Sequence, residues 1–308
     1  MTNPVAVITG ASSGIGLALT QHLVSKAWHV VLLDLNPPPA SASLPKDATL
    51  FVQCDVSSWS SQSSAFARAF EWRRRVDFAA LNAGIDDRDD IFNTLPSTNG
   101  SSAPPPPIKP NMKTLEVDLF GVYYGIKLFA HYASLSPSPN KDIIITASSA
   151  ALYPIPSVPQ YSTAKNGLLG LVRSLAPSAA AHGFTINAIC PDMIQTALAP
   201  DGLMEGYPND AKTPMSTMLR AYDDLLGLAS GGAEKKNGQV LEVVMDQLIY
   251  REGLKPLNKK QGAENLEGVL ELWENVYRDR NIAFARKTEE QERAKARARA
   301  TATATAKL

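Results

Sequence analysis

The sequence has few cysteines and histidines, and it carries no excess of charge of either sign. Its 308 residues include two cysteines and four histidines, and 30 basic residues balance 30 acidic ones. Balanced charge gives no reason to expect a nucleic acid or an anionic membrane as a partner, and a small neutral ligand fits better. Cys54 and Cys190 lie in apolar, strand-like runs, so we expect reduced core thiols rather than a disulfide. No metal site is predicted.

Long hydrophobic runs and a cationic leader are also absent. The N-terminus, MTNPVAVITG, has no basic residue ahead of a short apolar run, unlike a signal peptide. No stretch approaches the roughly 18 uninterrupted apolar residues of a membrane span. These absences predict a soluble, cytoplasmic protein without a membrane partner. The hydrophobic content of 44% allows a sizeable core, built as one large domain or as one domain with an appendage.

Short β-branched runs alternate with longer segments of helical period. The predicted strands are residues 5–9, 29–34, 50–55, 78–82, 143–147 and 185–189, with 239–244 as a last strand at the sheet edge. The predicted helices are residues 15–26, 58–74, 113–133 and 161–180. Continuously apolar strands separated by helices indicate a doubly wound parallel sheet of the α/β class, a Rossmann fold.

Three segments interrupt this alternation. Residues 96–110 contain SSAPPPP and predict an exposed, Pro-rich inserted loop. Residues 194–213 follow a strand end and predict a substrate lid, with a plain surface loop as the alternative. Beyond a main domain of residues 1–255, residues 256–284 predict a C-terminal helix. Residues 285–308 predict a low-complexity tail, as a frayed helix or disorder, for which solubility is favoured over RNA contact.

The strongest local motif is TGASSGIG at residues 9–16, between the first predicted strand and the first helix. Its glycines permit a tight turn and let backbone amides approach a pyrophosphate, while the helix N-terminus adds partial positive charge. The strand–turn–helix context therefore favours dinucleotide binding over an ordinary glycine turn. The candidate cofactor-binding residues of this loop are Gly10, Ser12, Ser13, Gly14, Ile15 and Gly16.

Asp34 ends the second predicted strand, 24 positions after Gly10 (34 − 10). A carboxylate there accepts hydrogen bonds from the ribose hydroxyls and repels a 2′-phosphate. No Arg or Lys among residues 11–13 compensates for that repulsion. The sequence thus predicts NAD as the cofactor, with NADP as the less favoured alternative that applies if Asp34 turns to solvent.

Tyr161 and Lys165 lie four positions apart in a predicted helix and therefore share one helix face. A tyrosine is a poor base at neutral pH, but a close ammonium favours its phenolate and makes it a usable acid–base group. This spacing alone is common on protein surfaces. Ser148 and Ser149 strengthen the prediction, because they end a buried predicted strand at the sheet edge where ligands bind.

Together these motifs resemble the short-chain dehydrogenase/reductase family over about residues 4 to 250. The resemblance implies an NAD(P)-dependent oxidoreductase acting on CH–OH groups. It implies that Ser148, 13 residues before Tyr161 (161 − 148), holds the substrate oxygen, with Ser149 as the alternative. It further implies that Tyr161 transfers the proton and that Lys165 also binds the nicotinamide ribose. Other implied cofactor contacts are Asp55, Val56, Asn82, Ala83, Gly84, Ile194 and Thr196.

Two positions depart from the family pattern. Asp118, in VDLFG, stands where the family usually has a catalytic asparagine, and Asp192 stands where it usually has glycine. We keep Asp118 as a fourth catalytic residue, since its carbonyl can still hold a water linked to Lys165. A carboxylate accepts hydrogen bonds but donates none when ionised, and it is expected to raise the pKa of Lys165.

Residues 145–176 resemble the group that includes 15-hydroxyprostaglandin dehydrogenase and fungal enzymes of terpenoid and polyketide pathways. This resemblance implies NAD-dependent oxidation of a secondary alcohol to a ketone on an apolar small molecule of fungal secondary metabolism. The family also implies a homodimer or homotetramer. Two alternatives are an NAD(P)H-dependent ketone reductase and, because of Asp118 and Asp192, a catalytically silent dinucleotide-binding regulator.

Overall fold

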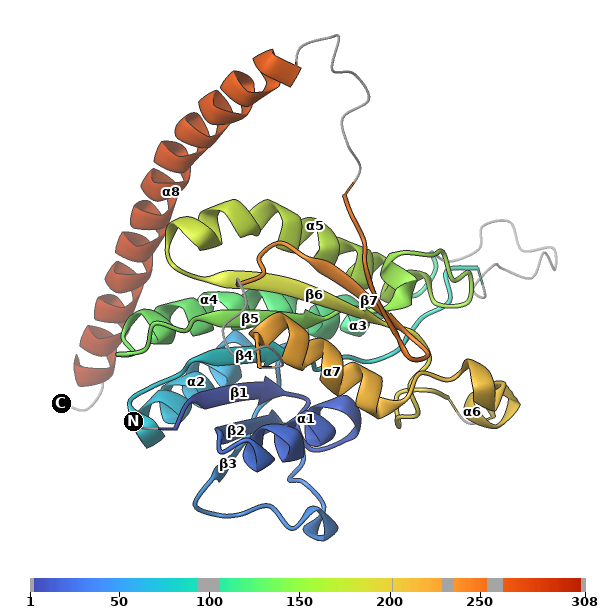
Figure 1. Ribbon diagram of the computed structural model, residues 1–308. Helices are drawn as coiled ribbons and strands as arrows, with labels where there is room; N and C mark the ends of the chain where they lie inside the picture. The colour runs from blue at the N-terminus through green and yellow to red at the C-terminus, as the bar shows by residue number, and fades with distance from the viewer. Residues whose placement is uncertain (1–2, 93–105, 201, 229–234, 254–262, 306–308) are drawn as a thin grey trace. The chain divides into compact units, whose positions relative to one another are not determined.

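The computed structural model describes residues 3–92, 106–200, 202–228, 235–253 and 263–305 of the chain. The chain divides into two compact units, Met1–Glu252 and Gly253–Leu308. In its described part, the first unit holds one sheet with its covering helices, and the second holds the 43-residue helix α8, Ala263–Thr305 (Figure 1).

The sheet of the first unit is eight-stranded, in the order β3-β2-β1-β4-β5-β6-β7-β8. Every neighbouring pair is parallel except β7 and β8, which are antiparallel. The strands are β1 Val5–Thr9, β2 His29–Asp34, β3 Thr49–Gln53, β4 Phe78–Leu81, β5 Asp142–Thr146, β6 Thr185–Pro191, β7 Val240–Val244 and β8 Gln247–Tyr250.

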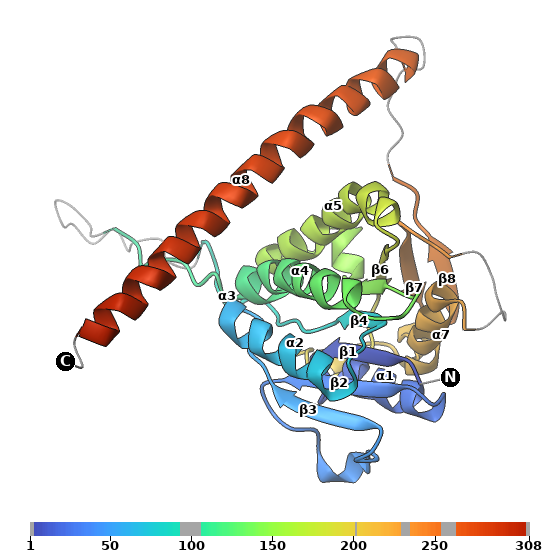
Figure 2. The ribbon, with the colours of Figure 1, turned by 90° about the vertical axis from the view of Figure 1, so that its left-hand side faces the viewer.

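Helices cover both faces of this sheet, as the two ribbon views show (Figures 1 and 2). One face carries α2 (Trp59–Arg73), α4 (Gly121–Ser134) and α5 (Pro159–Ala181), and the other carries α1 (Gly14–Ser25) and α7 (Met215–Leu226). The predicted doubly wound α/β fold with a C-terminal helical extension is confirmed.

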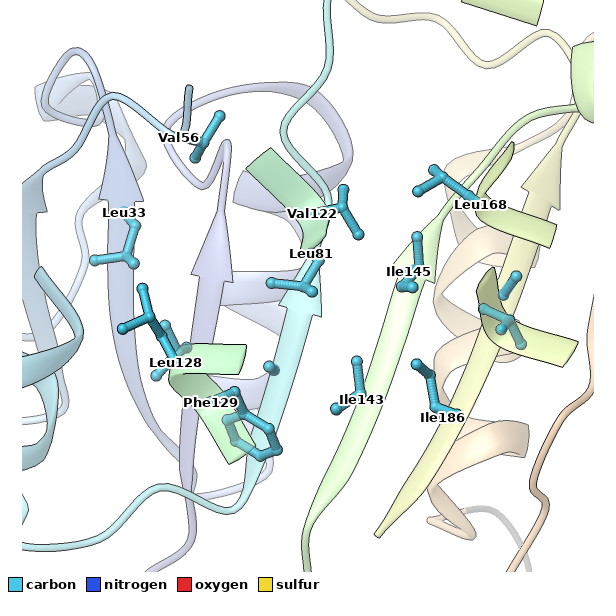
Figure 3. Close-up of a cluster of buried hydrophobic side chains, with 14 of the residues drawn as sticks. Leu33, Val56, Leu81, Val122, Leu128, Phe129, Ile143, Ile145, Leu168 and Ile186 are labelled. Carbon is cyan, nitrogen blue, oxygen red and sulfur yellow. The ribbon is translucent and has the colours of Figure 1, made fainter. Parts of the chain in front are cut away.

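Strand residues alternate between the two apolar layers. In β1, Val5 and Val7 belong to the cluster under α2, α4 and α5, whereas Ala6 and Ile8 belong to the cluster under α1 and α7. This is the period-two pattern of a strand buried on both faces. Figure 3 shows the first cluster, in which Leu81, Ile145 and Ile186 of neighbouring strands pack beside Leu168 of α5 and Phe129 of α4.

The edge of the sheet differs from the prediction. Residues 239–244 were expected as the edge strand, but β7 is flanked by β6 on one side and by β8 on the other. Met245 turns the chain between β7 and β8 with φ +50°. Hairpin turns of this kind favour Asn-Gly or Asp-Gly, and the Met-Asp here carries no such signal. The prediction also lacks helix α7.

The helix predicted at residues 113–133 contains a change of helical type. It consists of the short α3 (Lys113–Leu115), a π-helical segment Glu116–Phe120, and α4. Isolated π turns within α-helices are frequent at functional sites, and this one contains Asp118.

The three irregular segments are described to different extents. The predicted Pro-rich loop 96–110 lies largely outside the described residues, and its described part, 106–110, is exposed and without helix or strand. The predicted lid 194–213 contains α6 (Leu203–Gly206) and a 3₁₀ turn (Asn209–Ala211), with residue 201 outside the described residues. Its ends approach each other, because Thr213 N–H donates to the Met193 carbonyl at 2.8 Å.

Helix α8 extends further than the predicted helix 256–284. It begins at Ala263 and continues to Thr305, through most of the segment predicted as a low-complexity tail. Residues 254–262 and 306–308 lie outside the described residues. Within the described part of the chain, no helix combines the length and the apolar character that crossing a bilayer requires.

Candidate active site

The predicted site residues gather at one edge of the sheet, where the parallel strands end. Thr9 ends β1, Asp34 ends β2, and Thr146 ends β5 two residues before Ser148. The chain leaves β1 for β2 on one side, while β4 pairs with β1 on the other. This is a topological switch point, outside which ligands bind in open α/β sheets.

The glycine loop after β1 leaves no room for a side chain at Gly10 or Gly16. Gly10 has φ +64°, and a Cβ there would lie 2.9 Å from the Cα of Ala83. A Cβ on Gly16 would lie 2.1 Å from the Gly10 carbonyl oxygen. Ser13 precedes the first residue of α1, so the free amides of the helix N-terminus open beside this bare backbone. The loop therefore fits the pyrophosphate of a dinucleotide.

The Asp34 side chain is directed at this loop. Its Oδ2 accepts from the Ser12 N–H at 2.9 Å, and its Oδ1 accepts from the Asn36 N–H at 3.1 Å. The Ser12 hydroxyl in turn donates to the Asn36 carbonyl at 2.6 Å. The alternative in which Asp34 turns to solvent is thus not what the structure has. A carboxylate beside the glycine loop is placed to accept hydrogen bonds from the ribose hydroxyls of a dinucleotide.

The residues after β3 and β4 complete this side of the site. Hydrogen bonds from Ser57, opposed by burial, lower the pKa of Asp55, and Lys113 contributes to the lowering. Val56 and Ala83 line one small concavity beside Thr9.

Asn82 links neighbouring strands through its side chain. Its amide Nδ2 donates to the Thr9 carbonyl at 3.3 Å, and its Oδ1 accepts from the Thr146 hydroxyl at 3.0 Å. Asn82, which follows β4, therefore links the ends of β1 and β5 through its side chain.

Lys165 and Asp118 form a buried ion pair on the other side of the site. The Lys165 Nζ lies 3.1 Å from Asp118 Oδ2, and the two side chains are 3% and 0% exposed. The same ammonium donates to the Thr146 carbonyl at 3.1 Å and lies 5.2 Å from the centroid of the Tyr161 ring. Gly84 borders this pair, because a Cβ there would lie 2.9 Å from Asp118 Oδ2.

The ion pair changes the proton affinity of both partners. Burial lowers the pKa of Lys165, but the Asp118 carboxylate and the Tyr161 phenol raise it more, and it stays above its ordinary value. Burial also raises the pKa of Asp118, against the opposing effect of Lys165. Lys165 therefore keeps its positive charge beside the Tyr161 ring at neutral pH.

The two strand-end serines make different contacts. The Ser148 hydroxyl oxygen accepts from the Ala150 N–H at 3.1 Å and so begins a 3₁₀ turn, Ser149–Ala151. An accepting hydroxyl still has its proton to donate. The Ser149 hydroxyl donates to Asp192 Oδ1 at 3.3 Å. This contact engages Ser149 with the residue that replaces the family's glycine, and it favours Ser148 as the substrate contact.

The segment 194–213 lies against this edge at two points. A Cβ on Gly14 would lie 3.2 Å from the Thr196 side chain, so Thr196 borders the glycine loop. Burial, and then the Asp192 carboxylate, raise the pKa of Tyr207. The side chain of Ile194, predicted as a cofactor contact, is buried in the apolar cluster under α1 and α7. Ile15 packs against that same cluster.

Sequence reasoning missed Asp87 and Tyr222. The Asp87 carboxylate accepts from the backbone amides of Gln160 and Tyr161, at 3.0 and 2.5 Å. The buried Tyr222 hydroxyl lies 2.9 Å from the hydroxyl of Thr146. Asp87 stands in the acidic run DDRDD, which resembles a solvated loop, and no local spacing connects it to a helix 73 residues later.

The described residues contain no group of three or more His, Cys, Asp or Glu side chains that could hold a metal ion. Cys54 and Cys190 are both buried and unpaired.

Comparison with known proteins finds related dehydrogenases. Short-chain dehydrogenase/reductase prx6 of Penicillium rubens is 29% identical over 286 residues, which cover 89% of this chain and 93% of that protein. The human 15-hydroxyprostaglandin dehydrogenase [NAD(+)] is 32% identical over 204 residues, covering 63% of this chain and 69% of that protein.

A solved structure shares the fold. The NADPH-dependent 3-quinuclidinone reductase from Rhodotorula rubra superposes with a TM-score of 0.64 at 23% identity, covering 79% of this chain and 90% of that one. The family model described as short chain dehydrogenase matches residues 4–202, which is more than half of the chain. The chain therefore belongs to the short-chain dehydrogenase/reductase family, whose members are oxidoreductases acting on CH–OH groups.

Proposed function

We propose that the protein is an NAD-dependent dehydrogenase that oxidises a secondary alcohol to a ketone on an apolar small molecule. The observation that carries the proposal is the charged Lys165 beside the Tyr161 ring, at the same sheet edge as the glycine loop and Asp34. A bound nicotinamide cofactor would supply the acceptor for the hydride that leaves the alcohol carbon.

The side chains of the chain divide the remaining work. Ser148, with its hydroxyl proton free to be donated, holds the substrate oxygen. Tyr161 takes the alcohol proton, because the neighbouring Lys165 ammonium stabilises its phenolate form. Asp118 keeps Lys165 charged inside the protein, and the Thr146 carbonyl fixes the position of its Nζ.

The choice of NAD rests on Asp34. Its carboxylate is held beside the loop by two backbone amides and would repel the extra phosphate of NADP. The residues assigned to the cofactor are those of the glycine loop, with Asp55, Val56, Asn82, Ala83 and Gly84 next to it. Thr196, over Gly14, is assigned to the nicotinamide side.

The surface next to the catalytic helix supports an apolar substrate. Ile155 precedes α5, and Leu198 and Leu203 belong to the segment 194–213; all three are large apolar side chains that are more than a third exposed. Where exposed apolar side chains form a contiguous patch, they mark ligand-binding or interaction surfaces. We infer that segment 194–213 closes over an apolar substrate, such as a terpenoid or polyketide intermediate of fungal secondary metabolism.

Exposed side chains and free thiols support an oligomeric state and a cellular compartment for the protein. Phe120 and Tyr123, on the π-helical segment and α4, are 50% and 56% exposed, which supports a homodimer or homotetramer built on these helices. The unpaired cysteines suit the reducing cytoplasm.

Cofactor titration tests the proposal. We expect NAD⁺ to bind at least about tenfold more tightly than NADP⁺, and Asp34→Ala to narrow that difference. Tighter binding of NADP⁺ by the native protein would overturn the cofactor assignment and favour a ketone reductase, which needs the same side chains in the reverse direction. NAD⁺ binding without any reduced nicotinamide across a broad panel of secondary alcohols would favour a silent regulator.

A further inference from the structure

Three consecutive residues join the cofactor side of the site to its catalytic side. They follow Gly84 directly. The Ile85 N–H donates to Asp118 Oδ1 at 2.8 Å, and the Asp86 carbonyl accepts from the Thr114 hydroxyl at 2.8 Å. The Asp87 carboxylate reaches the first turn of α5. Residues 85–87 therefore connect the end of β4, the π-helical segment and the helix that carries Tyr161.

The start of α5 lacks a capping group of its own. Its N-cap residue, Val158, has no side-chain acceptor, and Pro159 opens the helix without an N–H. The amides of Gln160 and Tyr161 are two of the donors that an α-helix leaves unpaired at its N-terminus. Asp87 supplies both acceptors, with Oδ2 on Gln160 and Oδ1 on Tyr161.

The charge of Asp87 suits this place. A carboxylate at a helix N-terminus is stabilised by the helix dipole and by charge-assisted hydrogen bonds. The neighbouring aspartates make other contacts in the described structure: Asp86 pairs with Arg88, and Asp90 accepts from the nearby Phe92 amide. Among the described hydrogen bonds of this run, those of Asp87 are the ones that reach α5.

We propose that Asp87 is a positioning residue that holds the first turn of α5, and with it the Tyr161 phenol, in register with Lys165 and the cofactor-lining residues. The inference rests on the proposed role of Tyr161 as the proton acceptor. One of the two capped amides is that of Tyr161 itself, so a shift of the cap moves the reacting side chain directly. Misplacement of a reacting group by about 1 Å can lower a rate by about 100-fold.

The experiment compares Asp87→Ala and Asp87→Asn with a matched control, Asp90→Ala, in the same acidic run. Amide hydrogen exchange of the first turn of α5 is measured in each variant, together with NAD⁺ affinity and the turnover of cyclohexanol with NAD⁺. Asp87→Ala is expected to lose protection at Gln160 and Tyr161 and to lower kcat by about 10- to 100-fold. NAD⁺ affinity should stay within about twofold, because the cofactor contacts are untouched.

The other variants keep the inference testable. Asp87→Asn retains one acceptor oxygen, so protection and kcat should fall between those of the wild type and Asp87→Ala, even where the alanine variant folds poorly. Asp90→Ala should match the wild type. Unchanged exchange at Gln160 and Tyr161 in Asp87→Ala, or an equal loss in Asp90→Ala, would overturn the proposal.

Tyr161→Phe separates this inference from the proposed function. If Tyr161→Phe retains full turnover, the catalytic assignment fails while the exchange data still report on the cap. If Tyr161→Phe is inactive and Asp87→Ala turns over at the wild-type rate, the assignment of Tyr161 stands and the positioning role of Asp87 is wrong.

Discussion

The two sides of the candidate site are built in different ways. On the cofactor side, glycines at three positions of the loop leave the backbone without side chains, and the contact of the Ser12 N–H with the Asp34 carboxylate spans 22 residues within one β-α-β unit. On the catalytic side, the contacts join distant elements: Lys165 pairs with Asp118 (165 − 118 = 47 residues), and Tyr161 is capped by Asp87 from 74 residues away.

This difference predicts different sensitivities. The cofactor side depends on the absence of side chains, so adding a single methyl group should damage it. The catalytic side depends on a buried ion pair, and removing one partner would leave the other charge buried without compensation, which destabilises the fold. Substitutions on the two sides should therefore separate dinucleotide binding from proton transfer.

The largest expected effect is that of Tyr161→Phe. Removing the phenol oxygen takes away the proton acceptor but leaves the ring in place, so kcat should fall by about 10²- to 10⁴-fold. NAD⁺ affinity should change little, which calorimetric titration checks. The control is Tyr277→Phe, an exposed tyrosine on α8, which should turn over like the wild type. Near-normal turnover in Tyr161→Phe would contradict the acid–base assignment.

On the cofactor side, Gly16→Ala tests the need for bare backbone. Its methyl group would lie 2.1 Å from the Gly10 carbonyl oxygen, so the loop must open. We expect a stability loss of about 1–3 kcal/mol and a loss of NAD⁺ binding. Thermal unfolding and cofactor titration measure the two effects. Normal NAD⁺ binding in this variant would show that the loop is not the pyrophosphate site.

Asp118→Asn, which restores the usual residue of the family, tests the ion pair through pH. In the wild type the pKa of Lys165 is raised, so the stability that Lys165 contributes is complete below its unfolded pKa of about 10.4 and is lost as pH rises through the higher folded value. Without the Asp118 carboxylate the pKa of Lys165 falls. The alkaline decline of kcat should therefore begin at a lower pH in the variant.

The matched control for this pH profile is Glu116→Gln. Glu116 is an exposed carboxylate two residues earlier in the same π-helical segment, where it pairs with Lys113 at the surface. Replacing the Glu116 carboxylate with an amide should leave the pH at which kcat begins to decline unchanged. An identical profile in Asp118→Asn and the wild type would mean that the ion pair does not set the charge state of Lys165.

The smallest expected effect is that of Gly170→Ala, which contrasts with Gly16→Ala. Gly170 lies in α5 on its exposed side, and a Cβ there meets nothing within 4 Å. Alanine is favoured over glycine in a helix by about 1 kcal/mol, so the variant should be more stable by up to about that amount. Thermal unfolding measures the gain, and turnover should stay unchanged. A lower unfolding temperature for Gly170→Ala than for the wild type would contradict the open surroundings of this position.

Much of the fold could be predicted because its signals are local. The apolar strand runs and the glycine loop each lie within a few consecutive residues, and the parallel strands β1 to β7 all lie within about two residues of prediction. Helix α7 and strand β8 were missed. The turn at Met245 and the short, half-exposed strand after it carry no periodicity or turn residue by which to recognise them.

For the candidate site, the sequence alone determined which residue types stand at the sheet edge, since a parallel sheet brings every strand's carboxyl end to one side. Only the tertiary structure decided which of them touch. It directed Asp34 to the glycine loop, buried Asp118 against Lys165, placed Ile194 in the core and brought Asp87 to the helix of Tyr161. The physical reason is that the partner of a carboxylate leaves no periodic pattern in the sequence. Tertiary packing brings that partner from tens of residues away, and burial then shifts the pKa that decides the charge of the carboxylate.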